Sequence, residues 1–310
     1  MGNIVGSIIP SIEEANISES LSMFFIADLH ALTTIKNRNV LEENVLHVAA
    51  AWLACNLNLQ KSILYRQSRI PIVCELAWYL SCHTPYPTLA NSHSFKDKSA
   101  NISSVSVGLF TYPVLMAADI LLFDATHITV GKDQKQHIEI ARDIALAFNN
   151  CYKSDVFVLP EALIKESVAT LPGTDGRKMS KSYNNTIDIF AEEESLRKSI
   201  MSIKTDSTPI DQSKDYENCS VYKLFCSICT EAEKNDMQEK YLSNKFGYGE
   251  AKKILLEKIL EKFNDERKKY TYYINNSDIV LDILEKNEQE IAYIAQSKIV
   301  MVREILGYGG

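Results

Sequence analysis

The sequence predicts an α/β fold, with a parallel sheet in the first part of the chain and an all-α region in the second. Two observations predict this class. Short apolar, β-prone runs alternate with helical patterns up to about residue 185, which is typical of a parallel sheet covered by helices on both faces. From there onward the patterns are helical and charged, without strand alternation.

Four short apolar runs predict the strands, and they cover residues 22–27, 62–65, 127–130 and 156–159. Between the first two strands, apolar residues from Leu41 to Trp52 share one helical face. We expect Pro71 and Pro113 to open the next two helices, because proline suits the first helical turn.

Two apolar stripes at helical spacing predict long helices in the second half. The first consists of Leu255, Leu256, Ile259, Leu260 and Phe263, and the second of Ile294, Lys298, Met301, Val302 and Ile305. Gly307 follows the second stripe, where a glycine commonly ends a helix.

The composition is that of an ordinary folded protein. The chain has 310 residues, of which 46% are hydrophobic and 24% charged, so we expect a folded chain and neither a disordered nor a fibrous one. No apolar run is long enough to span a membrane, and the start lacks the pattern of a secretory signal, so we expect a cytoplasmic protein with no membrane partner. The net charge of −7 gives no global basic field, although a local patch remains able to bind RNA.

A loop rich in turn residues lies where the two regimes meet, at residues 172–176. It continues as Arg177-Lys178-Met179-Ser180-Lys181-Ser182, which places three cations and two hydroxyls after two glycines. Such a segment suits a polyphosphate, because the cations neutralise it and the glycines let the loop close over a nucleotide. The alternative is a solvated basic loop.

A second candidate segment follows the predicted strand that ends at Val130. Gly131 would let a nucleotide approach the backbone, Asp133 would accept hydrogen bonds from ribose hydroxyls, and Gln134 would reach the substrate. The alternative is a capping box, in which Asp133 and Gln136 cap the following helix.

Tyr112, Met116 and Asp119 are spaced to lie on one face of the helix that follows Pro113. Asp119 lies in an apolar run, so its carboxylate needs a partner. That partner is either an internal donor or the N–H of a bound ligand such as an indole, with Tyr112 and Met116 as apolar walls. His30 follows the first predicted strand, although a lone histidine is more often structural.

Several stretches together resemble the tryptophanyl-tRNA synthetases, which are class I aminoacyl-tRNA synthetases. The most specific is KMSKS at residues 178–182, the second signature of that class. The other stretches are FFIADLHALT at 24–33, FKDKS at 95–99, GLFTYPVLMAADILL at 108–122, VGKDQKQHIEIARD at 130–143 and DGRKMSKSYNN at 175–185. Their order and spacing also match along nearly the whole chain.

The resemblance implies a Rossmann-like catalytic domain over residues 1–185, ending in the KMSKS loop, and a helical anticodon-end domain over residues 186–310. It implies a homodimeric enzyme that activates L-tryptophan with ATP and Mg²⁺ to tryptophanyl-adenylate. The acyl group then passes to tRNA(Trp).

The resemblance also assigns roles to residues. Lys178 and Lys181 would neutralise the departing pyrophosphate, Lys98 would be a third phosphate ligand, and Asp119 would read the indole N–H. The nucleotide site would comprise Gly2, Asn3, Gly131, Lys132, Asp133, Lys178, Met179, Ser180, Lys181 and Ser182. The tryptophan site would comprise Tyr112, Met116, His30, Val130 and Gln134 around Asp119.

The chain departs from the family pattern at its start. Residues 1–3 match only the last part of the first class signature (HIGH), so we expect the strand and turn before it to be missing. Two explanations stay open: an intact enzyme with a mis-assigned start, or a tRNA- or tryptophan-binding protein impaired in adenylation. A tyrosine enzyme is a weaker third. Pro10 is a smaller departure, because proline inside a helix kinks it.

Three cysteines, Cys219, Cys226 and Cys229, have spacing that hints at a metal site, but structural zinc needs four ligands. A few relatives bind a 4Fe–4S cluster through such a triple and an earlier fourth cysteine, whose place Leu196 takes here. We therefore predict no protein-bound metal or iron–sulfur cluster.

Overall fold

The computed structural model describes residues 1–92, 105–131, 134–164 and 171–309, except for the side chain of Ser182. Their contacts define two compact units that are interleaved along the chain. The first contains residues 1–20, 50–61 and 167–277, and the second contains residues 21–49, 62–166 and 278–310. The predicted functional division at residue 185 stays a prediction.

The strand-bearing second unit contains two parallel pairs of strands. In one pair, β1 (Ser22–Ile26) lies beside β2 (Ser62–Arg66), with Ser22 opposite Ser62. In the other, β3 (His127–Val130) lies beside β4 (Glu161–Ile164), with His127 opposite Glu161. Three of the four predicted strands and the parallel α/β class are thereby confirmed.

The predicted strand at residues 156–159 is wrong, because the strand begins only after Pro160, at Glu161. Val156 and Phe157 are buried, which explains the apolar signal. Their backbone is bonded by side chains and not by a neighbouring strand. Asn149 donates to the Phe157 carbonyl at 2.8 Å and accepts from its N–H at 3.1 Å. Burial without strand pairing therefore produced the false signal.

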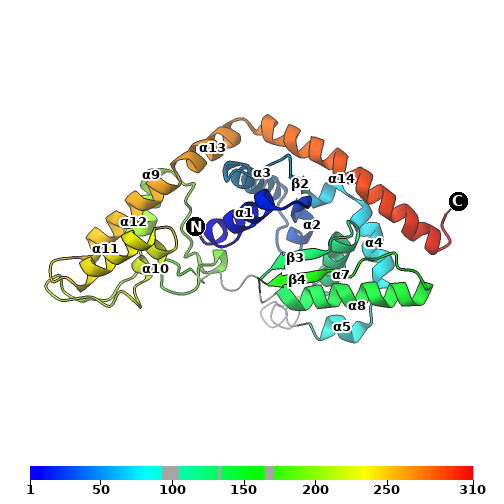
Figure 1. The fold of residues 1–310 in the computed structure, drawn as a ribbon, viewed down its shortest axis with the longest axis horizontal. Coiled ribbons are helices and arrows are strands. Elements are labelled where there is room, and N and C mark those ends of the chain that lie inside the picture. Colours follow the sequence, from blue (N-terminus) through cyan, green and yellow to red (C-terminus); the bar gives the residue numbers. More distant parts are fainter. Residues whose placement is uncertain (93–104, 132–133, 165–170, 310) are drawn as a thin grey trace. The chain divides into compact units, whose positions relative to one another are not determined.

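Helices surround these strands in the second unit, and Figure 1 shows α7 and α8 beside β3 and β4. They are α2 (Asp28–Ala31), α3 (Arg38–Ala54, whose last turn lies in the first unit), the 3₁₀ turn η2 (Gln67–Arg69), α4 (Ile72–Ser81), α5 (Tyr86–Ala90), α7 (Val107–Leu121), α8 (Lys135–Tyr152) and α14 (Ser277–Ile305). Apolar side chains of α4, α7, α8 and α14 form one continuous core.

Pro71 precedes α4 as predicted, but Pro113 does not open its helix. Helix α7 begins at Val107, where the Ser106 hydroxyl accepts the N–H of Leu109 at 3.2 Å. Pro113 therefore lies inside the helix, where it is buried. A serine cap outweighs the local preference of proline for a first turn.

The last helix, α14, belongs to the strand-bearing unit and ends near Gly307, which adopts a left-handed φ of 84° as predicted. Its buried stripe is shifted from the predicted one. Val302 and Lys298 are buried, but Met301 is 48% exposed. The Lys298 ammonium is accommodated because it contacts the Asp124 carboxylate at 2.5 Å.

The first unit begins with a π-helical turn η1 (Ile4–Ile8) that continues into α1 (Ile9–Ile17). Pro10 lies inside an unbroken helical run, as expected, and the change from π-helix to α-helix falls just before it. The other elements are the 3₁₀ turn η4 (Lys181–Tyr183), α9 (Glu193–Met201), α10 (Ser220–Cys226), α11 (Glu231–Leu242), α12 (Tyr248–Lys262) and α13 (Asn264–Asn275).

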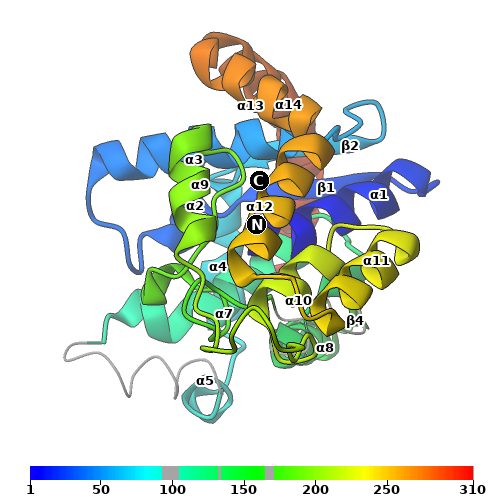
Figure 2. The same cartoon turned by 90° about the vertical axis from the view of Figure 1, so that its left-hand side faces the viewer.

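Figure 2 shows α10, α11 and α12 packed together, and they bury most of the stripe predicted on α12. The helical character of the second half is therefore confirmed. Among the residues that the structure describes, no helix is both long and apolar enough to cross a bilayer.

Candidate active site

Asp119 is a buried carboxylate on α7 with two internal partners. The side-chain amide of Gln67 donates to both carboxylate oxygens at 2.8 Å, and His30 Nε2 lies 2.9 Å from one of them. The Gln67 carbonyl oxygen in turn accepts the backbone N–H of His30 at 3.3 Å, which fixes which end of the amide faces Asp119. The internal partners expected as one alternative are thus present.

Burial raises the pKa of Asp119, while the hydrogen bonds from His30 and Gln67 act in the opposite direction. The nearby charge of Asp28 also raises it. A carboxylate held in this way keeps free lone pairs, because each oxygen can accept more than one hydrogen bond. Asp119 can therefore accept a further N–H from a ligand.

Gln67 and His30 meet because β1 and β2 are parallel, so their carboxyl ends lie at one edge of the sheet. Asp28 connects the turn after β1 to the turn after β2. Its carboxylate accepts hydrogen bonds from the backbone N–H of Ser68 at 2.8 Å and from the Ser68 hydroxyl. Sequence reasoning found His30 but missed Gln67. The signal was available, because Gln67 lies two residues after the second predicted strand and directly after the observed strand β2.

Tyr112, one helical turn before Met116 on α7, bonds to a second missed residue. Its hydroxyl lies 2.8 Å from Nε2 of His137, which is buried in the first turn of α8. The rings of Tyr112 and His30 lie edge to face at 6.2 Å. Met116 and Val130 are half-buried and pack against the core. The structure therefore brings Asp119, His30 and Tyr112 together, and the remaining predicted tryptophan-site residues keep that role as predictions.

The segment after β3 is described only in part. Gly131 is exposed, and its carbonyl accepts the N–H of Gln134 at 3.0 Å just before α8 begins. Lys132 and Asp133 lie outside the described residues, as does Lys98, so neither their proposed roles nor capping by Asp133 is tested.

The KMSKS loop of the first unit is a turn held by Asn185. The side chain of this residue accepts the N–H of Ser180 at 2.7 Å and donates to the Lys178 carbonyl at 3.1 Å and to Asp175 at 2.7 Å. Gly173 lies directly against it, since a Cβ there would come within 2.4 Å of the amide. The stretch 175–185 thus forms one hydrogen-bonded unit.

The three cations of this loop are not equivalent. Arg177 is bonded to Asp175 at 2.7 Å and lies 4.4 Å over the ring of Tyr183. The hydrogen bonds from Asn185 and Arg177 lower the pKa of Asp175 to about 2. Lys178 and Lys181 are exposed, so their ammonium groups remain accessible to an anion.

The start of the chain lies against the same loop. The Gly2 N–H points at the sulfur of Met179 at 3.2 Å, and a Cβ on Gly2 would be equally close to that sulfur. Asn3 is exposed and its side chain does not cap the following turn. The structure thus places Gly2 beside one predicted nucleotide-site residue.

The cysteines show no ligand geometry. No group of three or more histidine, cysteine or acidic side chains with metal-binding geometry occurs within the described residues. Cys219 lies 3.3 Å from the Tyr241 hydroxyl. Burial raises the pKa of Cys229 to about 11, which keeps it a thiol.

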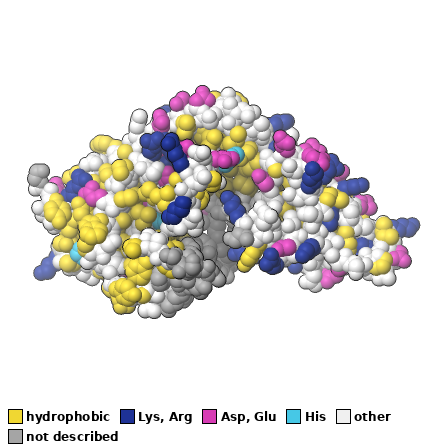
Figure 3. Space-filling model, turned by 180° about the vertical axis from the view of Figure 1, so that it is seen from behind, with side chains coloured by type: hydrophobic (Ala, Val, Ile, Leu, Met, Phe, Trp, Pro, Cys, Tyr) yellow, Lys and Arg dark blue, Asp and Glu magenta, His cyan; other side chains and the backbone are white. Residues whose placement is uncertain are grey.

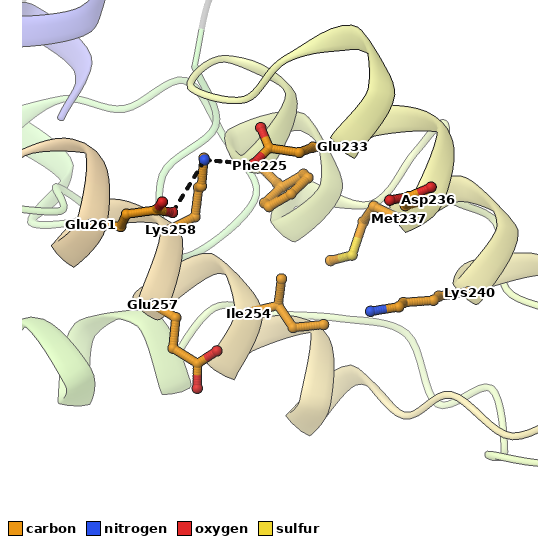
Figure 4. A pocket seen from close by; sticks show the side chains of 9 residues that line it. All are labelled: Phe225, Glu233, Asp236, Met237, Lys240, Ile254, Glu257, Lys258 and Glu261. Carbon is orange, nitrogen blue, oxygen red and sulfur yellow. Dashed lines mark hydrogen bonds and ion pairs between the residues drawn. The ribbon is translucent and has the colours of Figure 1, made fainter.

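A cavity of about 240 Å³ lies among α10, α11 and α12 (Figure 4). Lys258 crosses its edge and bonds to Glu233 at 2.6 Å and to Glu261 at 3.2 Å. Its lining includes none of the predicted site residues.

Comparison with known proteins agrees with this geometry. The sequence profile of the family described as "tRNA synthetases class I (W and Y)" matches residues 5–279. The chain therefore belongs to the class I tRNA synthetases of this family. Its structural neighbours are class I synthetases, which supports the Rossmann-like α/β domain with a helical C-terminal part.

The relatives point to one branch of the family. The chain is 45% identical to a tryptophan–tRNA ligase of Fusobacterium nucleatum over 93% of this chain and 88% of the relative. It is 44% identical to a tryptophan–tRNA ligase of Campylobacter jejuni over 99% of this chain and 95% of that relative. A crystal structure of the Campylobacter enzyme, complexed with ADP and tryptophan, has a TM-score of 0.93 over 99% of this chain and 95% of that one. These comparisons do not confirm that a segment is missing at the start.

Proposed function

We propose that this chain ligates L-tryptophan to tRNA(Trp) in two steps. The tryptophan carboxylate attacks the α-phosphorus of ATP, the bond to pyrophosphate breaks, and tryptophanyl-adenylate forms. A terminal ribose hydroxyl of the tRNA then attacks the activated carbonyl, and AMP leaves. The observation that carries the proposal is the buried Asp119 carboxylate, held by His30 and Gln67 with capacity for one more donor.

The indole N–H is the donor that we assign to Asp119. Leaving a buried carboxylate with an unmet acceptor site costs free energy when an analogue without this N–H binds, so the site discriminates by hydrogen bonding. Tyr112, Met116, Val130 and Gln134 surround the substrate in this proposal. A tyrosine substrate would instead present a phenolic hydroxyl, and the relatives named above support tryptophan.

In this proposal the KMSKS loop stabilises the negative charge of the departing pyrophosphate. Because Arg177 is bonded to Asp175, Lys178 and Lys181 are the cations left to stabilise the departing pyrophosphate. ATP enters as its Mg²⁺ complex, with Lys98 as a third phosphate ligand. Gly2, Asn3, Gly131, Lys132, Asp133, Met179, Ser180 and Ser182 complete the nucleotide site in this proposal.

We further infer a cytoplasmic homodimer, as the resemblance to the family implies. Light scattering at micromolar concentration tests the dimer. A monomeric mass would overturn it.

Tryptophan-dependent ATP–pyrophosphate exchange tests the function, with tyrosine as the control amino acid. Exchange with tryptophan and none with tyrosine is expected. The alternative of a non-catalytic binding protein, which the comparisons do not favour, requires tryptophan binding without exchange. Exchange with tyrosine alone would contradict the assignment of Asp119.

A further inference from the structure

A hollow in the first unit is lined by a combination of side chains that the adenylation chemistry does not use. Its volume is about 640 Å³, and it lies between the end of α3 and one side of α13. Its lining consists of Leu53, Asn56, Leu57, Lys268, Lys269, Tyr272 and Tyr273, which we call the lysine–tyrosine hollow.

The sides of α13 differ in what their side chains contact. Arg267 donates to the carbonyls of Ile189 and Ala191, and Tyr270 stacks on Phe190 with ring centroids 4.1 Å apart. Those residues fasten the helix to its own unit. The α13 residues of the lysine–tyrosine hollow occupy the remaining positions of this helix, where Lys268 and Lys269 are exposed and the Lys269 ammonium donates to the side-chain oxygen of Asn56.

The charge of the hollow is positive. Two lysines line it and no carboxylate does. A third lysine is held at the same turn, because Lys61 donates to the Asn16 carbonyl at 2.7 Å while the Asn16 amide donates to the Asn56 carbonyl at 3.2 Å. Acidic and basic side chains are interspersed over the face of the molecule shown in Figure 3, and the net charge of the chain is −7. A lining with two lysines and no carboxylate is therefore a local feature of the hollow.

The aromatic part of the hollow is partly exposed. Tyr272 is 52% exposed, and its ring meets that of Tyr273 edge to face at 5.6 Å. The buried side chains of Leu53 and Leu57 lie in the same lining. An open aromatic face beside lysines fits a ligand that is both planar and anionic. Unpaired nucleotides have this character, since their bases stack on aromatic rings and their phosphates pair with lysines.

We propose that the lysine–tyrosine hollow binds an unpaired nucleotide of the tRNA substrate, with its phosphate at Lys268 and Lys269 and its base against Tyr272. This inference rests on the proposed function, because it takes the RNA of that reaction as the partner. It assigns the hollow to tRNA affinity and leaves tryptophan adenylation independent of it.

Charge reversal and loss of the ring test the proposal on the full chain. Anisotropy of fluorescently labelled tRNA(Trp) measures binding, and exchange without tRNA measures adenylation and correct folding. The double change Lys268→Glu with Lys269→Glu is expected to weaken tRNA binding at least about tenfold and to reduce the slope of log affinity against log salt by about two. Tyr272→Ala is expected to weaken binding about tenfold and Tyr272→Phe to preserve it.

A double change of Lys153→Glu with Lys286→Glu, both exposed in the other unit, matches the charge reversal. It should alter tRNA affinity less than about twofold. Equal weakening by both double changes would overturn the proposal in favour of a general charge effect, as would unchanged binding in the hollow variants. Displacement of the labelled tRNA by free AMP, with no effect of the hollow variants on tRNA affinity, would also overturn the proposal. Absence of exchange in the unaltered chain would instead contradict the proposed function, and the anisotropy result would still stand.

Discussion

Replacement of Gln67 by leucine is the sharpest test of how the tryptophan site discriminates. The change keeps the approximate size of the side chain but removes the amide that donates to both oxygens of Asp119 at 2.8 Å. Gln67 is 1% exposed, so water does not take its place without rearrangement. The Asp119 carboxylate then retains only the bond from His30.

The two hydrogen bonds from Gln67 hold the Asp119 carboxylate in one orientation. Those bonds are also present without tryptophan, so they affect kcat/KM through the bond that the oriented Asp119 carboxylate makes to the indole N–H. Loss of one bond to a charged group costs about 1.5–3 kcal/mol, which corresponds to about 10- to 150-fold in kcat/KM for tryptophan. The pH dependence should change as well. Burial already raises the pKa of Asp119, and loss of Gln67 removes a hydrogen bond that lowers it. The acid limb of kcat/KM, where activity falls as Asp119 becomes protonated, should therefore move to higher pH.

Pyrophosphate exchange with two amino acids separates this specific role from general disorder of the pocket. The second amino acid is a tryptophan analogue that carries sulfur in place of the indole N–H. Gln67→Leu should reduce the preference for tryptophan over this analogue. Equal losses for both amino acids, with an unmoved pH profile, would refute the reasoning and leave Gln67 a structural residue.

Three further predictions concern charged groups elsewhere. Lys178→Ala should lower the rate of exchange about 100-fold with unchanged tryptophan binding by calorimetry, and an effect under threefold would contradict its role on the leaving group. Glu288→Ala should lower the free energy of unfolding in urea by about 3–5 kcal/mol, because it removes the carboxylate that lies 2.6 Å from the buried guanidinium of Arg66. The control is Glu285→Ala, which removes an exposed carboxylate near the same guanidinium and should lower the free energy of unfolding by less than about 1 kcal/mol. The folded pKa of Asp175 lies below its ordinary value, so its stabilisation of the KMSKS loop is present above pH 3.8 and is lost as the pH falls toward 2. The protection of the Ser180 amide against hydrogen exchange, relative to an unstructured peptide at the same pH, should fall with that loss, and protection that is constant over this range would disagree.

Local sequence patterns predicted the strands correctly where an apolar run also pairs with a neighbouring strand. The strands at 22–26, 62–66 and 127–130 each pair with a neighbouring strand, and the strand at 62–66 is buried throughout. Gly307 ends a helix with a positive φ. The predicted strand at 156–159 failed because Asn149 bonds to the Phe157 backbone in place of a neighbouring strand. Side-chain bonds of this kind leave no periodic trace in a sequence.

The candidate site was predictable to the extent that it follows sheet topology. Asp119 and His30 were singled out, and Gln67 obeys the same rule for the carboxyl ends of parallel strands. His137 is different. It bonds to Tyr112 from a separate helix, and only the packing of α7 on α8 brings the two side chains within 2.8 Å. The sequence contains no local pattern for a contact of that kind.

The KMSKS loop shows why residue types alone do not assign roles. In the sequence, Arg177, Lys178 and Lys181 are three equivalent cations. In the structure, Arg177 pairs with Asp175, and Asn185 holds that carboxylate as well as the Lys178 carbonyl and the Ser180 N–H. One cation therefore stabilises the turn, and the other two stay accessible to an anion. Because Asn185 bonds to both ends of the turn, Asn185→Ala would loosen the lysines without changing their charge.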